Sequence, residues 1–159
     1  MARGKVTASC DDLFIVAERD IITIAKTIDK FGLKDEHLNI KIVEDANLAA
    51  EKFLKGYLIK NNIEVLKIHE LDLLFKMAFD NNNNFKDIKE DCALLDEYGV
   101  EVKYDPTIEI KEDVADKAVR ALENIYNFAE IKHIRDELRN NNNDYPQKEY
   151  NLSDVINNN

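Results

Sequence analysis

The sequence predicts an all-α protein: an up-and-down bundle of about five helices, with one extended loop before the last helix. Three observations favour this fold class. Apolar residues recur at the helical spacing of three and four along most of the chain. Leu, Ile, Ala, Lys and Glu dominate the composition and favour helices. With only 4 Gly and 2 Pro, the 159 residues hold little material for the tight turns of an all-β fold.

The chain divides into three segments. Residues 1–10 are polar and without periodicity, so we expect a flexible N-terminus. Residues 11–139 contain the helical bundle. Residues 140–159 are rich in Asn and poor in apolar residues, which predicts a mobile tail. The alternative for this tail is a short docking turn formed by its few apolar side chains, Leu152, Val155 and Ile156.

The first two helices have clear start and stop signals. Asp11 and Asp12 supply capping oxygens before a helix over 13–31, and Gly32 is a suitable C-terminal stop. The second helix is expected to begin at Asp35 and Glu36 and to end near residue 61. Its main apolar face consists of Ala46, Ala49, Ala50, Phe53, Leu54 and Tyr57.

This second helix is predicted to lie at the centre of the bundle. Leu48 and Ile59 fall roughly opposite its main apolar face, and a helix with two apolar stripes is packed from both sides. Gly56 lies between the stripes, where a glycine costs about 1 kcal/mol relative to alanine. We therefore expect Gly56 to mark a close helix crossing.

Three further helices complete the prediction. One begins near His69 and forms a hairpin with the central helix, and the next covers 85–98 and ends at Gly99. Apolar and charged residues then alternate over 100–104, which predicts a strand-like loop across the bundle before Pro106. The last long helix is expected over 110–139.

Charge and composition narrow the classes of function. A formal net charge of −10 repels phosphate backbones and argues against general nucleic-acid binding. No apolar run approaches the ~20 residues of a membrane span. Cys10 and Cys92 are not at a metal-binding spacing, and no secretory signal is visible. We expect a cytoplasmic protein with two reduced thiols, no membrane contact, no metal site and no required cofactor.

Five residues are candidates for binding an anionic ligand such as a nucleotide, and each has a structural alternative. Lys52 and Lys55 are one helical turn apart and can approach one phosphate, or simply solvate the helix. His69, near a helix start, can touch the ligand or cap the helix. Lys103 and Tyr104 offer a cation and a stacking ring, or a loop packed on the bundle.

Two stretches carry a resemblance to a known family. Residues 49–58 (AAEKFLKGYL), followed by 68–71 (IHEL), resemble a helix and the next helix start of the HEPN domain. Residues 98–106 (YGVEVKYDP) are similar to the aromatic loop that precedes the last long helix in that family. The resemblance covers roughly residues 13–134 and implies a helical bundle that folds this loop back over the hairpin.

The chain departs from the family pattern at two points. Lys103 stands where the loop usually carries Arg, and Lys lacks the bidentate fork that clamps a phosphate. Many members of the family are metal-independent ribonucleases that use an Arg followed four to six residues later by His, paired across a dimer. Arg120 is much farther from His133, and neither Arg135 nor Arg139 is followed by a His. The acid–base group of that reaction is therefore missing.

The resemblance implies a non-catalytic module that binds a nucleotide, with ATP and GTP as candidates, or a protein partner. The implied partner is a small nucleotidyltransferase in a toxin–antitoxin or defence-type system. The alternatives are a metal-independent endoribonuclease toxin with a divergent site and a plain dimeric scaffold. Surplus apolar residues on the hairpin, Leu48, Ile59, Leu73 and Met77, predict a homodimer or a higher closed oligomer.

Overall fold

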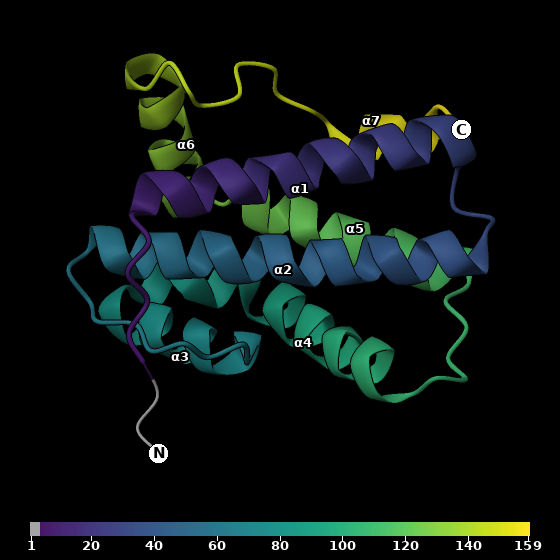
Figure 1. Cartoon of the computed structure of the whole chain (residues 1–159), viewed down its shortest axis with the longest axis horizontal. Helices are drawn as coiled ribbons and strands as arrows, with labels where there is room; N and C mark the ends of the chain where they lie inside the picture. The colour runs from purple at the N-terminus through teal and green to yellow at the C-terminus, as the bar shows by residue number, and fades with distance from the viewer. Residues whose placement is uncertain (1–3) are drawn as a thin grey trace.

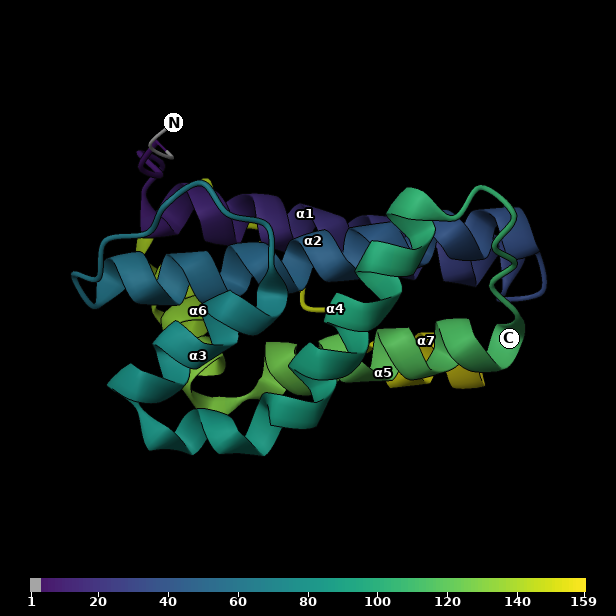
Figure 2. The same cartoon turned by 90° about the horizontal axis from the view of Figure 1, so that it is seen from below.

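The computed structural model describes residues 4–159 as an all-α bundle (Figures 1 and 2). Its helices are α1 (Cys10–Phe31), α2 (Glu36–Lys60), α3 (Leu71–Asn81), α4 (Lys89–Tyr104), α5 (Glu112–Asn127), α6 (Ala129–Asn141) and α7 (Leu152–Asn157). A 3₁₀ segment, η1 (Asn83–Ile88), joins α3 to α4. Within the described residues, extended pairing is confined to one isolated antiparallel bridge between Lys5 and Leu66. The all-α prediction is therefore confirmed.

Local signals explain the first two helices. The Ser9 hydroxyl accepts a hydrogen bond from the Asp12 N–H at 3.0 Å, and Gly32 ends α1 with φ = 66°. At the start of α2, Asp35 Oδ1 accepts from the N–H groups of His37 and Leu38. The capping residues predicted from the sequence thus set both ends of the connection between α1 and α2.

Helix α2 is the central element, as its two apolar stripes predicted. It packs against α1, α3, α4, α5 and α6, and Figure 2 shows it between α1 and the α4–α5 pair. Buried side chains occur on all sides of α2, among them Val43, Ala50 and Leu54. This arrangement fixes the positions of every helix that contributes to the site described below.

Gly56 allows α1 and α2 to approach closely, which confirms the predicted crossing. A Cβ atom at position 56 would lie 2.5 Å from two carbons of the Phe14 ring. That ring is fully buried and packs edge-on against Phe53, with centroids 5.0 Å apart. A methyl group at position 56 therefore displaces a core ring that has no empty space to move into.

We expect Gly56→Ala to lower the free energy of unfolding by about 1–2 kcal/mol. Because the new Cβ would lie only 2.5 Å from two ring carbons, we expect an overpacking cost of about 2–3 kcal/mol, which outweighs the gain of about 1 kcal/mol in helix propensity. Urea denaturation measures the change. Combining Gly56→Ala with Phe14→Leu frees space, so the double variant should lose less than the sum of the single losses. A Gly56→Ala protein that is more stable than the parent would contradict this packing argument.

The region around residue 100 differs from the prediction. Residues 100–104 are not a strand-like loop, because α4 continues through Gly99 to Tyr104. Gly99 is a helical residue rather than a stop: a Cβ there would collide with the side-chain amide of Asn47 on α2. Close packing of α4 on α2 therefore accounts for the glycine. The extended loop covers residues 105–111 instead, and the Asp105 carboxylate caps its turn by accepting from Thr107.

The predicted last helix over 110–139 is divided in two. Phe128 adopts ψ = 131°, which ends α5 and starts α6. Its ring is 8% exposed and packs on Phe85 with centroids 4.8 Å apart. The apolar periodicity of the sequence continues across Phe128, because α5 and α6 each bury one apolar stripe. The sequence pattern alone therefore did not indicate that the helix breaks there.

The two ends of the chain contact the bundle, where the sequence predicted a flexible N-terminus and a mobile tail. In place of a flexible N-terminus over 1–10, the Val6 N–H donates to Val65 O and the Lys67 N–H donates to Gly4 O, both at 2.8 Å. Residues 1–3 of that prediction lie outside the described residues. At the other end, residues 142–157 run from α6 along α1 to α7, where a mobile tail was expected (Figure 1). In the short helix α7, Leu152 is fully buried, which is the placement that the alternative of a docking turn expects.

A buried charged cluster holds the C-terminal segment. The Glu18 carboxylate on α1 accepts hydrogen bonds from the Tyr126 hydroxyl (2.9 Å), the Tyr145 hydroxyl (2.7 Å) and Arg139 (3.1 Å). Arg135, also fully buried, stacks on the Tyr126 ring 3.4 Å from its centroid. Burial raises the pKa of Glu18, and the two tyrosine hydroxyls and the two arginines oppose that shift. We call these five residues the Glu18 cluster.

Candidate functional site

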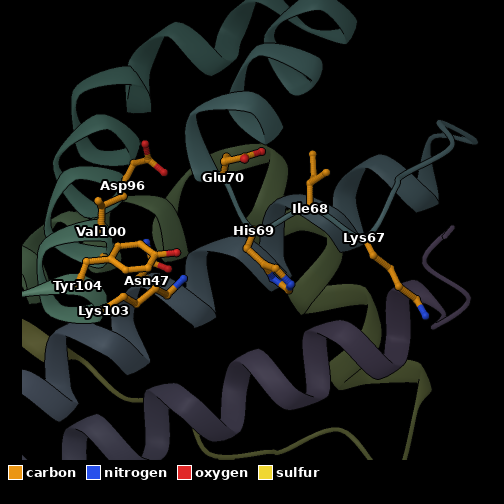
Figure 3. Close-up of a pocket in the computed structure, with 10 residues that line it drawn as sticks. Asn47, Lys67, Ile68, His69, Glu70, Asp96, Val100, Lys103 and Tyr104 are labelled. Atoms are coloured by element: carbon orange, nitrogen blue, oxygen red, sulfur yellow. The ribbon is translucent and has the colours of Figure 1, made fainter. Parts of the chain in front are cut away.

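A polar pocket of about 390 Å³ opens beside α2, between the segment that precedes α3 and the C-terminal half of α4 (Figure 3). Its lining comprises Asn47, Lys67, Ile68, His69, Glu70, Asp96, Gly99, Val100, Lys103 and Tyr104. This size lies at the lower end of the roughly 300–1,000 Å³ typical of small-molecule sites. We refer to it as the polar pocket.

Three of the five predicted binding residues line this pocket: His69, Lys103 and Tyr104. Figure 3 shows Asn47, Lys103 and Tyr104 gathered on one side, with His69 between this group and Lys67. Tyr104 is 79% exposed, so its ring is free to stack on a ligand. Lys103 makes no ion pair with any described residue, which leaves its ammonium group available. Helix α4, rather than a folded-back loop, positions both side chains.

Lys52 does not belong to this group. Its ammonium nitrogen lies 2.9 Å from Asp20 Oδ2 on α1, and both side chains are largely buried. Lys52 therefore does not line the polar pocket, and its joint approach with Lys55 to one phosphate stays a prediction. The reason is tertiary, because α1 packs over the face of α2 that carries Lys52 and supplies its counter-charge.

Lys55 is engaged inside the fold. Its ammonium group donates to Glu51 Oε1 at 3.0 Å, and its side chain is 9% exposed. The same carboxylate oxygen lies 2.8 Å from His69 Nδ1. Glu51 therefore orients His69 at the edge of the polar pocket, and Lys55 neutralises the charge of Glu51.

The expected helix start at His69 is displaced by two residues. Helix α3 begins at Leu71, whose N–H donates to Asp96 Oδ1 at 2.9 Å. A side chain of α4 thus satisfies this first donor of α3, and it is not available to an incoming anion. His69 does not cap the helix either, because its Nδ1 faces Glu51.

The charges around the polar pocket are mixed. Lys67, Lys103 and His69 favour an anion, while Asp96 and Glu70 on the opposite rim disfavour one. Because Asp96 also binds the start of α3, its negative charge is held in place. Because positive and negative side chains nearly cancel, we expect the pocket to bind a phosphate group weakly. Other parts of a ligand must then supply most of its affinity.

Sequence reasoning missed Asn47. This residue is 4% exposed, and its Nδ2 donates to Leu95 O on α4 at 2.9 Å. It lines the polar pocket beside Lys103 and contacts Gly99 (Figure 3). The available signal was a polar residue one turn before Glu51 on a helix predicted to be buried from both sides, where an unpaired amide is unfavourable.

The fold and this pocket define an all-α bundle with a polar site beside its central helix, between the segment that precedes α3 and the C-terminal half of α4. A family model, that of the HEPN domain, matches residues 33–132. The chain therefore belongs to the HEPN family. The match includes α2, α3, α4 and α5, and hence every residue that lines the polar pocket.

No curated protein and no solved structure matches the chain. Across residues 4–159, no helix is both long enough and apolar enough to cross a membrane.

The residues considered for the family's ribonuclease chemistry have other partners. Arg120 on α5 binds Asp116 at 2.6 Å and also contacts Ser153 and Asn157 of the C-terminal segment. His133 on α6 faces Glu137, with 3.7 Å between Nε2 and Oε1. The two residues thus lie on different helices and are held by different carboxylates.

Proposed function

We propose that this protein is a non-catalytic HEPN module that binds a nucleotide in the polar pocket. The observation that carries the proposal is the meeting of Lys103, Tyr104 and His69 in one cavity. Lys103 supplies a cation for a phosphate group, and Tyr104 supplies an exposed ring for a base or ribose. Lys67 and Asn47 also line this pocket, whereas Lys52 and Lys55 are paired with carboxylates of the fold.

Binding should be weak and sensitive to salt. A few partly exposed charge contacts are each worth about 1 kcal/mol or less, so we expect a dissociation constant on the order of 0.1–1 mM. Calorimetric titration with ATP and with GTP measures it. Lys103→Glu should abolish measurable binding, while Lys86→Glu, an equal charge change on η1 away from the pocket, should not. Equal binding by both variants would place the site elsewhere.

We further propose that the module acts with a small nucleotidyltransferase in a toxin–antitoxin or defence-type system. HEPN membership supports a role related to nucleotides or RNA, and the weak site suits a module that works beside an enzyme that handles nucleotides. Purification from the native cell, followed by identification of the co-purifying proteins, tests this. Recovery of the protein without a nucleotidyltransferase would contradict it.

A homodimer or a higher closed oligomer remains our expectation. Leu73 on α3 is 41% exposed, and Phe79 on the same helix is 37% exposed, so the hairpin leaves apolar surface uncovered. Ile59 and Met77, which we also expected to contribute, are partly buried against the core. Light scattering at micromolar concentration should give at least twice the monomer mass of 18.4 kDa, and Leu73→Glu should reduce it. A monomeric parent protein would refute the expectation.

One observation favours a second function, the endoribonuclease with a divergent site. Glu51 holds His69 Nδ1 at 2.8 Å, and the His69 side chain is 71% exposed. A carboxylate on one imidazole nitrogen leaves the other free to act as a general base. The polar pocket would then present this nitrogen to RNA.

We nevertheless predict no ribonuclease activity of the family type, because the Arg–His spacing is missing. Incubation with RNA in EDTA, followed by gel analysis, should show no cleavage. Cleavage that is lost in His69→Ala but kept in His37→Ala would establish the second function instead. Cleavage lost in His133→Ala would show that the chemistry lies on α6.

A further inference from the structure

The histidine of the polar pocket is held on one edge by a buried ion pair. His69 Nδ1 lies 2.8 Å from Glu51 Oε1, and the Lys55 ammonium donates to the same oxygen at 3.0 Å. The Glu51 and Lys55 side chains are buried, whereas the His69 side chain is exposed and lies between Lys103 and Lys67 in Figure 3. Glu51 therefore engages one ring nitrogen and leaves the other, Nε2, accessible.

This contact fixes where a neutral His69 carries its single ring hydrogen. The Glu51 carboxylate already accepts from an ammonium group, so it has no hydrogen to donate and His69 Nδ1 must be the donor. In a neutral imidazole the second nitrogen is then an acceptor with a lone pair. Phosphate oxygens also accept hydrogen bonds, so a neutral His69 cannot donate to the group that the polar pocket is proposed to bind.

The charges around His69 lead to the same requirement. Within residues 4–159, the charged side chains that pair with it or share its pocket are Glu51 and Lys55 on α2, Lys67 and Glu70 beside it in the chain, and Asp96 and Lys103 on α4. Three are positive and three are negative, so they sum to zero, and Tyr104 adds a neutral hydroxyl. Protonation of Nε2 adds one positive charge and one hydrogen-bond donor at the same atom, and both favour an anion.

We infer that the polar pocket takes up an anionic group only together with a proton, which binds His69 Nε2. Glu51 is the positioning residue, because it keeps Nδ1 occupied. The inference rests on the proposed nucleotide site and specifies how its phosphate group is held, by a charged imidazole together with a pocket lysine. The proton comes from the buffer acid, whose conjugate base stays in solution. Because an imidazole loses its charge between about pH 5 and 8, binding should weaken as the pH rises.

Nuclear magnetic resonance of the free protein tests the first step. At about pH 8, long-range nitrogen–proton correlations should show the His69 hydrogen mainly on Nδ1. A hydrogen mainly on Nε2 would overturn the inference, because the neutral ring could then already donate to an anion. This measurement uses the parent protein, so no substitution disturbs the buried pair of Glu51 and Lys55.

Sulfate tests the coupling itself, because it resembles phosphate but keeps its double negative charge throughout this pH range. Titration with sodium sulfate is followed by nuclear magnetic resonance, with the ionic strength held constant by sodium chloride. We expect the affinity to fall about tenfold between about pH 6 and about pH 8, since the pocket lysines stay charged and retain some attraction. Sulfate should also move the His69 ring signals toward those of a charged imidazole and leave the signals of His37 and His133 unchanged.

Two variants assign the proton to His69. His69→Gln keeps an uncharged N–H donor near the position of Nε2 but cannot take up a proton, so its affinity for sulfate should change by less than about twofold over the same pH range. His37→Gln, an exposed position in the first turn of α2 and outside the pocket, should keep the tenfold change. The same pH dependence in both variants would overturn the inference.

Titration with ATP separates this inference from the proposed function. If ATP binds in the polar pocket but sulfate binds independently of pH, or does not bind, the inference fails alone. If neither ATP nor sulfate binds at either pH, the proposed function fails with it.

Discussion

Replacing Glu18 by alanine should lower the free energy of unfolding by about 3–5 kcal/mol, the range observed when one partner of a buried ion pair is removed. The Glu18 carboxylate is 1% exposed and faces Arg135, which is fully buried, and Arg139, which is 14% exposed. Without it, two guanidinium groups lose their buried counter-charge, and the hydroxyls of Tyr126 and Tyr145 lose their acceptor.

Glu149→Ala is the matched control. Glu149 also pairs with Arg135, at 2.9 Å, but it is 46% exposed. Surface ion pairs contribute about 1 kcal/mol or less, so this variant should remain close to the parent. Urea denaturation at neutral pH compares the two variants. If the two variants lost unfolding free energy within 1 kcal/mol of each other, burial would not be the reason that Glu18 stabilises the fold.

Deleting residues 143–159 should have a second large effect, a loss of about 5 kcal/mol. The deletion removes Tyr145 and Leu152, which are 1% and 0% exposed, and burying one large side chain stabilises by about 1.5–3 kcal/mol. It also removes the Ser153 hydroxyl and N–H that donate to Glu123, and the tyrosine hydroxyl that donates to Glu18. A loss of this size is a large part of the 5–15 kcal/mol that stabilises a typical domain.

Thermal and urea unfolding of the truncated protein measure this effect. Deletion of residues 158–159 alone is the control, because both are exposed and lie beyond α7. The deletion of residues 143–159 also tests whether the C-terminal segment is a mobile tail or is packed on the bundle. A truncated protein as stable as the parent would support the mobile tail suggested by composition, whereas a large loss would support the packed arrangement.

Much of the fold was predictable because it depends on neighbours in the sequence. The predicted caps at Gly32 and Asp35 act over three or four residues, and the apolar stripes of α1 and α2 follow the helical period. At the start of α1 the cap is Ser9 rather than the predicted Asp11 or Asp12. The two apolar stripes of α2 predicted its central position. The glycine at position 56, which is unfavourable within a helix, predicted the close crossing. Neither feature depends on which helices pack against α2.

The candidate site was predictable only in part. His69, Lys103 and Tyr104 were proposed from their residue types and their places near a helix start and in a predicted loop, and they line one pocket. Asn47 was missed because its importance comes from the backbone of α4, 48 residues later in the chain. Gly99 was taken for a helix stop, because a glycine that ends a helix and one that permits a crossing look alike in sequence.

The sequence by itself determined the helical class, the central helix and the family, because periodicity, capping and motif residues are local properties. Only the tertiary structure decided that Lys52 pairs with Asp20, that Glu18 binds Tyr145, and that the C-terminal segment packs on α1. The physical reason is the same in each case. A charged side chain has no preferred partner until packing brings one within about 3 Å and removes the water between them.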